Sequence, residues 1–254
     1  MPDINFHELG KGPILILIHG FPMNSQIWSE FRIPLSKSFC VITIDLPGFG
    51  DSPILKTPFT IDDVATEILQ WIEEKEISNY VIIGHSLGGY VALSMAEKKP
   101  EPIAGFSLLH STALADSEEK KQSRIKVIDF VDKNGAFAFT SNFTSTLFAD
   151  QNHPAIEKVR TISIQSSAEA VKSYTAAMKD RPAKINVLRE FKKPILFLTG
   201  ESDSGIPVET ILQQSSLTFN PEVHILKNVA HMGMFEDPDT LTKLISTFVK
   251  RCVS

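Results

Sequence analysis

Several short stretches of the chain are apolar at almost every position. They lie at residues 14–18, 41–44, 80–83 and 195–198. A strand that is apolar at consecutive positions is buried on both faces, as in a parallel sheet covered by helices. Each stretch ends abruptly in glycine or polar residues. The pattern therefore predicts a mainly parallel central sheet.

Segments with a helical period separate these strands. Between residues 61 and 74 the apolar side chains fall on one helical face, and Thr60 with Asp63 fits a capping box. Further helices are predicted over residues 87–98 and 238–250. Strands that alternate with helices predict an α/β fold with a doubly wound sheet of about seven to eight strands. The functional site of such a sheet lies beyond the carboxyl ends of its strands.

The pattern changes over residues 113–185. This stretch contains a single glycine, Gly135, and no buried-strand run. It predicts about four helices, the first of which ends at Asn134 and Gly135. We therefore expect an α/β core of residues 1–112 and 186–254, with residues 113–185 inserted as an all-helical cap over the sheet.

Composition and charge narrow the class of protein. The chain has 254 residues, of which 43% are hydrophobic and 22% are charged, enough for a large buried core. The net charge of −5 and the scattered basic residues argue against a nucleic-acid or anionic-membrane surface. Cys40 and Cys252 form no recognisable pair. The beginning of the chain does not resemble a signal peptide, and no apolar stretch is long enough to span a membrane. We expect a cytoplasmic protein.

One strand ends in a tight turn with a serine at its apex. Residues 80–83 are followed by the sequence Gly-His-Ser-Leu-Gly, in which the serine is Ser86, and a helix begins at once. A serine at such a turn exposes its hydroxyl group beside the N–H groups of a helix start. It becomes a nucleophile only if a base removes its proton and a polar group orients that base.

Loops after later strands supply a base and an acid. His231 lies between the last strand and the last helix, where a base is needed. The other histidines that we weighed are expected to be structural: His7, His19, His85, His153 and His224. For the acid we favour Asp203 over Glu201, because Glu201 abuts the strand end. The alternative role for Asp203 is to cap the helix that follows near Pro207.

Ester chemistry also needs hydrogen-bond donors where negative charge develops. The backbone N–H of Leu87 adjoins the serine, and the N–H of Phe21, on the loop after an earlier strand, is the expected second donor. The loss of one such donor typically lowers the rate by about 10²–10³-fold. No cluster of histidine, cysteine and carboxylate residues has the spacing of a metal site, so we expect neither a metal nor a cofactor.

Together these residues resemble the α/β-hydrolase family over nearly the whole chain. Residues 84–89 resemble its nucleophile elbow, residues 19–21 its oxyanion loop, and residues 45–52 its loop after the next strand. Asp203 and His231 match the acid and the base, in the order serine, acid, histidine. By this resemblance the inserted helices are the lid of the family.

The resemblance implies a serine hydrolase that cleaves a small carboxylic ester, thioester or lactone through an acyl-enzyme on Ser86. A serine at the elbow argues against the dehalogenases and epoxide hydrolases of the family, which have aspartate there. Two alternatives stay open. One is carbon–carbon hydrolysis, or an elimination like that of the menaquinone-pathway synthase, by the same triad. The other is a signalling protein that senses a small molecule.

The side chains of the insertion bear on the substrate. Its phenylalanines are expected mostly to pack the helices onto the core, and the alternative is that one or two of them line an apolar acyl or alcohol pocket; they are Phe130, Phe137, Phe139, Phe143 and Phe148. Arg124, Arg160 and Arg181 are candidates to orient a substrate carboxylate, although a solvated helix face is the default expectation for each. The sequence specifies neither the natural substrate nor the oligomeric state.

Overall fold

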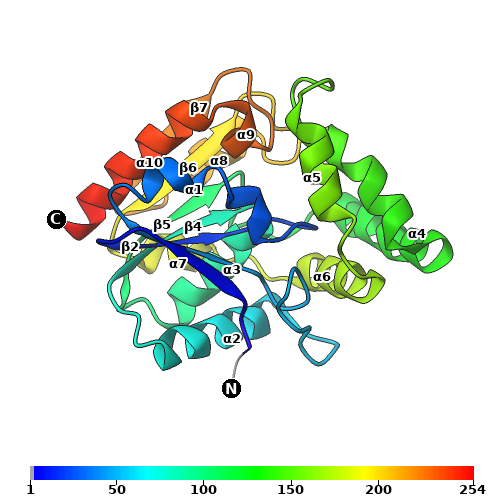
Figure 1. Ribbon diagram of the computed structural model, residues 1–254, viewed down its shortest axis with the longest axis horizontal. Helices are drawn as coiled ribbons and strands as arrows, with labels where there is room; N and C mark the ends of the chain where they lie inside the picture. Colours follow the sequence, from blue (N-terminus) through cyan, green and yellow to red (C-terminus); the bar gives the residue numbers. More distant parts are fainter. Residues whose placement is uncertain (1–2) are drawn as a thin grey trace.

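A seven-stranded sheet runs through the computed structural model, which describes residues 3–254 (Figure 1). Its strands are β1 (Phe6–Leu9), β2 (Ile14–Ile18), β3 (Cys40–Ile44), β4 (Tyr80–His85), β5 (Ile103–Leu109), β6 (Ile195–Gly200) and β7 (Pro221–Leu226). Their order is β1-β3-β2-β4-β5-β6-β7, and only β1 runs antiparallel to its neighbour. The predicted mainly parallel sheet is confirmed. Met1 and Pro2, which begin the segment considered as a signal peptide, lie outside the described residues.

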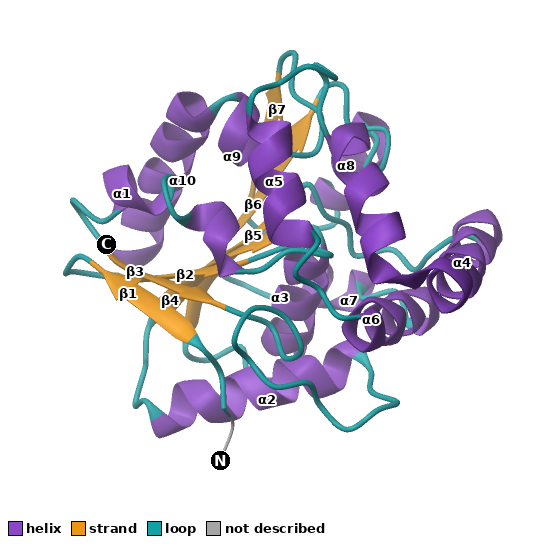
Figure 2. Ribbon diagram, turned by 45° about the vertical axis from the view of Figure 1, so that its right-hand side comes forward, coloured by secondary structure: helices purple, strands orange, loops and turns teal. Residues whose placement is uncertain are grey.

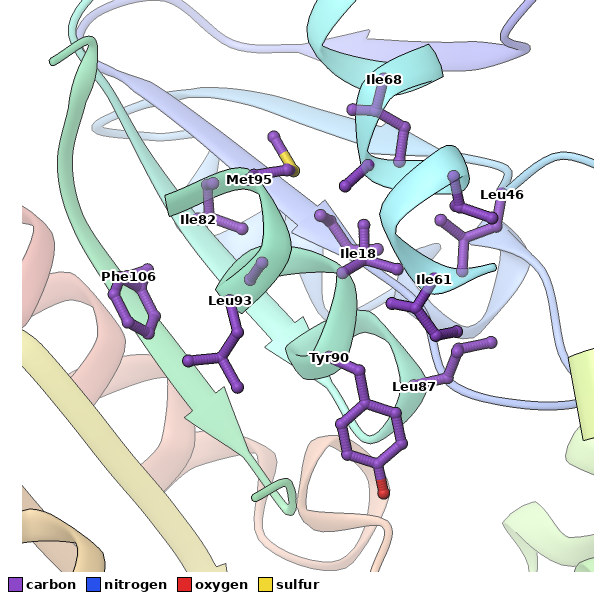
Figure 3. Packing of buried hydrophobic residues seen from close by; sticks show 14 of the residues in the cluster. Ile18, Leu46, Ile61, Ile68, Ile82, Leu87, Tyr90, Leu93, Met95 and Phe106 are labelled. Carbon is purple, nitrogen blue, oxygen red and sulfur yellow. The ribbon is translucent and has the colours of Figure 1, made fainter. Parts of the chain in front are cut away.

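Helices cover both faces of this sheet. They are the 3-10 helix η1 (Ser25–Trp28) and the α-helices α1 (Arg32–Leu35), α2 (Ile61–Glu74), α3 (Leu87–Lys98), α7 (Ile185–Glu190), α8 (Val208–Ser215), α9 (Gly233–Glu236) and α10 (Pro238–Val253). Alternate side chains of each strand enter opposite layers: Ile18 packs with α2 and α3, whereas Leu17 packs with η1, α1 and α10. Figure 3 shows Ile18 with Ile68 of α2 and Met95 of α3. Burial on both faces explains the unbroken apolar runs.

The helix α2 begins with the capping box that the sequence predicts. The side chain of Thr60 accepts a hydrogen bond from the N–H of Asp63 at 3.1 Å, and the Asp63 carboxylate accepts one from the N–H of Thr60 at 2.8 Å. These two bonds satisfy N–H groups that have no partner inside the helix. The cap therefore fixes where the helix starts.

The chain between β5 and β6 is helical, as predicted. Before α7 it forms α4 (Glu118–Phe143), the 3-10 helix η2 (Thr144–Leu147), α5 (Ala155–Ser163) and α6 (Ala168–Asp180). The expected helix end at Gly135 agrees with the backbone, where α4 is broken by a kink. Gly135 leaves the helical conformation, with φ of +81°, but the helix resumes directly after it. Figure 2 shows α4 and α6 side by side at the periphery of the molecule. Among the described residues, no helix is long and apolar enough to cross a membrane.

Candidate active site

Ser86 lies at a strained turn between β4 and α3. Its φ of +52° is uncommon for any residue except glycine, and such strain concentrates at functional sites. Glycines allow the turn, because a Cβ on Gly84 would overlap the backbone carbonyl oxygen of Gly88. The Ser111 hydroxyl donates a hydrogen bond to the Ser86 carbonyl at 2.7 Å. The strand β4, the helix α3 and the segment after β5 thus fix the position of Ser86.

The loops after β6 and β7 bring Asp203 and His231 into contact. His231 Nδ1 donates to Asp203 Oδ2 at 2.8 Å. The other oxygen, Oδ1, accepts from the N–H groups of Gly205 at 2.9 Å and Ile206 at 3.1 Å. The alternative of a helix cap is wrong, because α8 begins at Val208 and no side chain caps it at its N-cap residue, Pro207. The buried carboxylate stabilises its own turn and orients the imidazole of His231.

A second histidine, His110, binds the same carboxylate oxygen. It is fully buried directly after β5, with φ of +49°. Its Nδ1 donates to Asp203 Oδ2 at 3.1 Å, and its Nε2 accepts from the N–H of Gly233 at 3.3 Å. A carboxylate only accepts and a backbone N–H only donates, so we assign the proton of the neutral ring to Nδ1.

The sequence analysis missed His110, whose partner lies 93 residues away in the chain. One signal was available. His110 follows a predicted strand directly, at the same sheet edge as Ser86, Asp203 and His231.

Burial and hydrogen bonding set the charges of this cluster. Burial alone would raise the pKa of Asp203, but His231 and His110 outweigh it and hold that pKa well below its usual range. For His110 burial dominates and lowers the pKa, although Asp203 opposes it. Near neutral pH the cluster therefore contains an ionised Asp203 and a neutral His110.

Two further side chains hold the backbone around His231. His85 is fully buried, and its Nε2 donates to the carbonyl oxygen of His231 at 2.9 Å. Burial holds the pKa of His85 well below its ordinary value. The Glu236 carboxylate accepts from the N–H groups of Ala230 at 3.1 Å and Met232 at 3.0 Å. His85 thus has the structural role that we expected, and Glu236 is a supporting residue that the sequence did not reveal.

The ligand atoms of His110, Asp203 and His231 lie within 4.8 Å of one another, as in a metal site. Both histidines, however, direct Nδ1 at the carboxylate as a hydrogen-bond donor, so neither offers that nitrogen's lone pair to a shared ion. We interpret the cluster as a carboxylate held by two histidines.

The loop after β2 packs directly against the elbow. A Cβ on Gly20 would lie 2.6 Å from His85 Nδ1 and 3.1 Å from Ser86 Cβ, so only glycine permits this approach. His19 fixes the loop: its Nε2 accepts from the N–H of Leu46 at 2.9 Å and its Nδ1 donates to the Gly20 carbonyl at 2.9 Å. His19 is structural, as expected.

This packing leaves two backbone donors beside the serine. Among the described residues, no acceptor takes a hydrogen bond from the N–H of Phe21. Leu87 is the first residue of α3, where helix geometry provides no partner for its N–H. Both groups are therefore available to bind an oxyanion.

A cavity of about 380 Å³ opens onto Ser86, Asp203 and His231. Helix α4 supplies Phe139 and Phe143 to its wall, and their rings stack with centroids 5.3 Å apart. Each also approaches the Phe21 ring, at 6.3 and 6.4 Å. The alternative that one or two phenylalanines of the insertion line a pocket agrees with this geometry.

The three candidate arginines have different surroundings. Arg124 lines the cavity that contains Ser86. Arg181 is buried and donates to Asp116 at 2.7 Å. Arg160 pairs with Glu157 at 2.9 Å near the surface. Only Arg124 of the three is placed to meet a substrate in this cavity.

A family model described as alpha/beta hydrolase fold matches residues 13–238, which include all of the site. The chain belongs to the α/β-hydrolase family. The strained serine, the five strand ends that meet at the site and the inserted helices all agree with this assignment. The protein is therefore an enzyme of the hydrolase class. The resemblance to this family that its motifs indicated is confirmed.

Relatives of this α/β-hydrolase include esterases. A pimeloyl-[acyl-carrier protein] methyl ester esterase of Wigglesworthia glossinidia brevipalpis is 28% identical in an alignment 257 positions long, gaps included, and 96% of each chain is covered. A thermophilic esterase from Thermogutta terrifontis, solved with malate bound, has 27% identity and a TM-score of 0.93, with 99% of this chain and 94% of that one covered. The enol-lactonase from Burkholderia xenovorans LB400 shares the fold, with a TM-score of 0.89 at 20% identity over 97% of this chain and 96% of that one.

Proposed function

We propose that this α/β-hydrolase cleaves carboxylic esters, thioesters or lactones through an acyl-enzyme on Ser86. The observation that carries the proposal is the convergence of the strained Ser86 and the Asp203–His231 pair on one cavity. The esterases among its relatives support the same class of reaction.

The proposed mechanism follows from the orientation of His231. Because its Nδ1 is bound to Asp203, its Nε2 is free to take the proton from Ser86 as the serine oxygen attacks the carbonyl carbon. The N–H groups of Phe21 and Leu87 then bind the oxyanion, and His231 returns the proton to the leaving alcohol or thiol. Water, activated by the same imidazole, releases the acid and restores Ser86. The negative charge of Asp203 stabilises the imidazolium that forms in each half of the reaction.

No hydrogen bond joins Ser86 Oγ to His231 among the described residues. In enzymes without substrate such bonds are often long and shorten only when the substrate binds. Both side chains line the same cavity, on the turn after β4 and the loop after β7.

We also infer that residues 113–185 act as a lid for this site. The inserted segment touches two of the active-site loops. The backbone carbonyl of Leu147 accepts from the N–H of His231 at 2.9 Å, and the Ser166 hydroxyl donates to the Pro22 carbonyl at 2.9 Å. An insertion held on both loops is suited to enclose the reacting groups and to shape the pocket.

The proposed function is tested with methyl esters and thioesters of increasing acyl length. We expect multiple turnovers by the wild type and a fall in kcat of about 10⁴-fold or more in Ser86→Ala. Ser94 is a buried serine of α3 that does not line this cavity, so Ser94→Ala is the matched control and should keep the wild-type rate. Fluorophosphonate labelling that persists in Ser86→Ala would refute the assignment of the nucleophile. Ligand binding without multiple turnover would instead favour the signalling alternative.

A further inference from the structure

We propose that this active site is specific for esters that carry a carboxylate at the far end of the acyl chain, and that Arg124 with Lys120 binds this carboxylate. The preferred substrate class is thus the half-ester of an aliphatic dicarboxylic acid. This inference rests on the proposed ester hydrolysis and adds the class of substrate.

The guanidinium of Arg124 is held on one side and open on the other. Its Nε donates to the buried carboxylate of Asp116. Among the described residues no acceptor binds its two Nη groups, and the side chain lines the cavity that contains Ser86. An arginine fixed in this way presents its remaining donors to a ligand in the geometry that suits a carboxylate.

The charge around Arg124 is not balanced by the protein. Asp116, whose side chain is fully buried, also accepts from Arg181 at 2.7 Å, so two guanidinium groups share one carboxylate. Burial alone would raise the pKa of Asp116, but the two arginines outweigh it and keep the group ionised. The three charges leave one positive charge in excess beside the cavity.

Lys120 adds a second cation on the same helix face. It precedes Arg124 by four residues on α4, lines the same cavity and approaches the Gly205 carbonyl at 3.4 Å. Like charges four residues apart destabilise a helix, and an anion bound between them removes that cost. Asp203 is the one carboxylate among the described residues that line this cavity, and two histidines already bind it. The protein as a whole carries a charge of −5, so this local excess is opposite in sign to the net charge.

The same cavity also has apolar side chains in its lining. Val127, Phe139, Phe143 and Leu147 line it. Methylene groups fit such a wall, whereas an internal polar group would lose hydrogen bonds with water there. The reacting ester, the aliphatic chain and the anionic end each have a matching group in the cavity lining: Ser86, these apolar side chains, and Arg124 with Lys120.

The other two candidate arginines do not compete for this role. Arg181 donates to Asp116, Met178 and Leu114, and its guanidinium lies 3.8 Å from the centroid of the Tyr90 ring. Arg160 lies outside the cavity lining and pairs with a glutamate. Arg160 therefore provides a matched control substitution.

The test compares monomethyl with dimethyl esters of succinic, glutaric, adipic and pimelic acids. Charge-assisted hydrogen bonds are strong enough to give a preference of about 10- to 100-fold in kcat/KM for the half-ester of best length. Arg124→Met should abolish most of this preference, mainly by raising KM. Lys120→Met should reduce it less, and Arg124→Lys should restore part of it. Asp116 keeps its bond to Arg181 in Arg124→Met, which favours normal folding, and Arg160→Met should retain the wild-type preference.

Two results separate this inference from the function on which it rests. Equal activity of the wild type on half-esters and diesters, with no change in their ratio in Arg124→Met, would overturn the carboxylate site and leave ester hydrolysis standing. If no ester is cleaved, titration of Ser86→Ala with the monomethyl esters still decides the inference. A dissociation constant that rises about 10-fold or more when Arg124→Met is added supports the inference. An unchanged dissociation constant refutes it.

Discussion

Asp203 uses its two oxygens for different tasks. Oδ1 closes the turn at Gly205 and Ile206, while Oδ2 accepts from two histidine rings. One of these rings, His231, borders the cavity, and the other, His110, is fully buried. His110 therefore acts on the proposed reaction through Asp203 and is a positioning residue.

The His110→Asn variant tests this role. Asparagine tolerates the left-handed backbone of this position, but its shorter side chain cannot span from Gly233 to Asp203. We expect kcat on a neutral ester to fall about 10-fold with little change in KM, and the free energy of unfolding to fall by about 1.5–3 kcal/mol. Steady-state kinetics and urea unfolding measure the two effects. His7→Asn, at an exposed position of β1, is the control, and an unchanged kcat in His110→Asn would contradict the role.

At the residue scale the sequence predicts the groups that stand in recognisable local contexts. Ser86, Asp203 and His231 each follow a strand, and the turn around Ser86 has a distinctive glycine pattern. His110 also follows a strand, but its role, like that of Asp116, depends on partners that only the fold brings together. The contacts of Arg124, Arg160 and Arg181 could not be predicted either, because they depend on how α4, α5 and α6 pack.

At the scale of helices and strands, the strands that are buried on both faces could be predicted from the sequence. A strand covered on both faces must be apolar throughout, so β2, β3, β4 and β6 are visible in the sequence. The start of α2 was visible because a capping box is local. The course of α4 past Gly135 was not, because packing against α6 lets the helix resume after a residue that normally ends one.

Replacement of Thr60 by alanine tests the cap of α2. The variant loses the side-chain acceptor for the N–H of Asp63, so the free energy of unfolding should fall by about 1 kcal/mol. Activity should not change, because Thr60 lies outside the lining of the cavity around Ser86. Thr161→Ala removes a hydroxyl within α5 and serves as the control for the loss of the side chain itself. Equal stabilities of the two variants would disprove the contribution of the cap.

Replacement of Gly84 by alanine tests the crossing of β4 and α3. Its Cβ would overlap a backbone carbonyl of α3, which cannot rotate away, so we expect a loss of about 3 kcal/mol in the free energy of unfolding. Gly205→Ala is the comparison, since its Cβ would meet the Asp203 carboxylate only at 3.3 Å. Thermal unfolding followed by circular dichroism measures both. A Gly84→Ala protein as stable as the wild type would show that the elbow has room for a side chain.

At the scale of the whole molecule, the fold buries several histidines close to one sheet edge. His19, His85 and His110 are fully buried, and burial lowers the pKa of each. An unfolded chain exposes the same rings with a pKa of about 6.5. The folded protein therefore binds fewer protons than the unfolded chain just below that pH.

This difference predicts an early loss of stability in mild acid. The contribution of the three rings is complete above about pH 6.5 and is lost as the pH falls through their lower folded pKa values. The free energy of unfolding should therefore decrease between about pH 6.5 and 5, before the contribution of Asp203, whose pKa is also lowered, declines below about pH 4. Urea titrations across this range provide the measurement, and His7→Asn should leave the slope unchanged. A stability that stays constant from about pH 7 to 5 would contradict this linkage.

The bond between Leu147 and His231 makes access to the site and reactivity of the site interdependent. If the 3-10 helix η2 rises from the sheet, the loop of His231 loses its partner, and Glu236 loses the N–H of Ala149 that it binds at 2.7 Å. An enzyme opened in that direction would hold its base less firmly than the closed one. Opening there would thus slow the attack of Ser86 until the substrate is enclosed. The insertion would then both close the site and keep the general base, His231, in position.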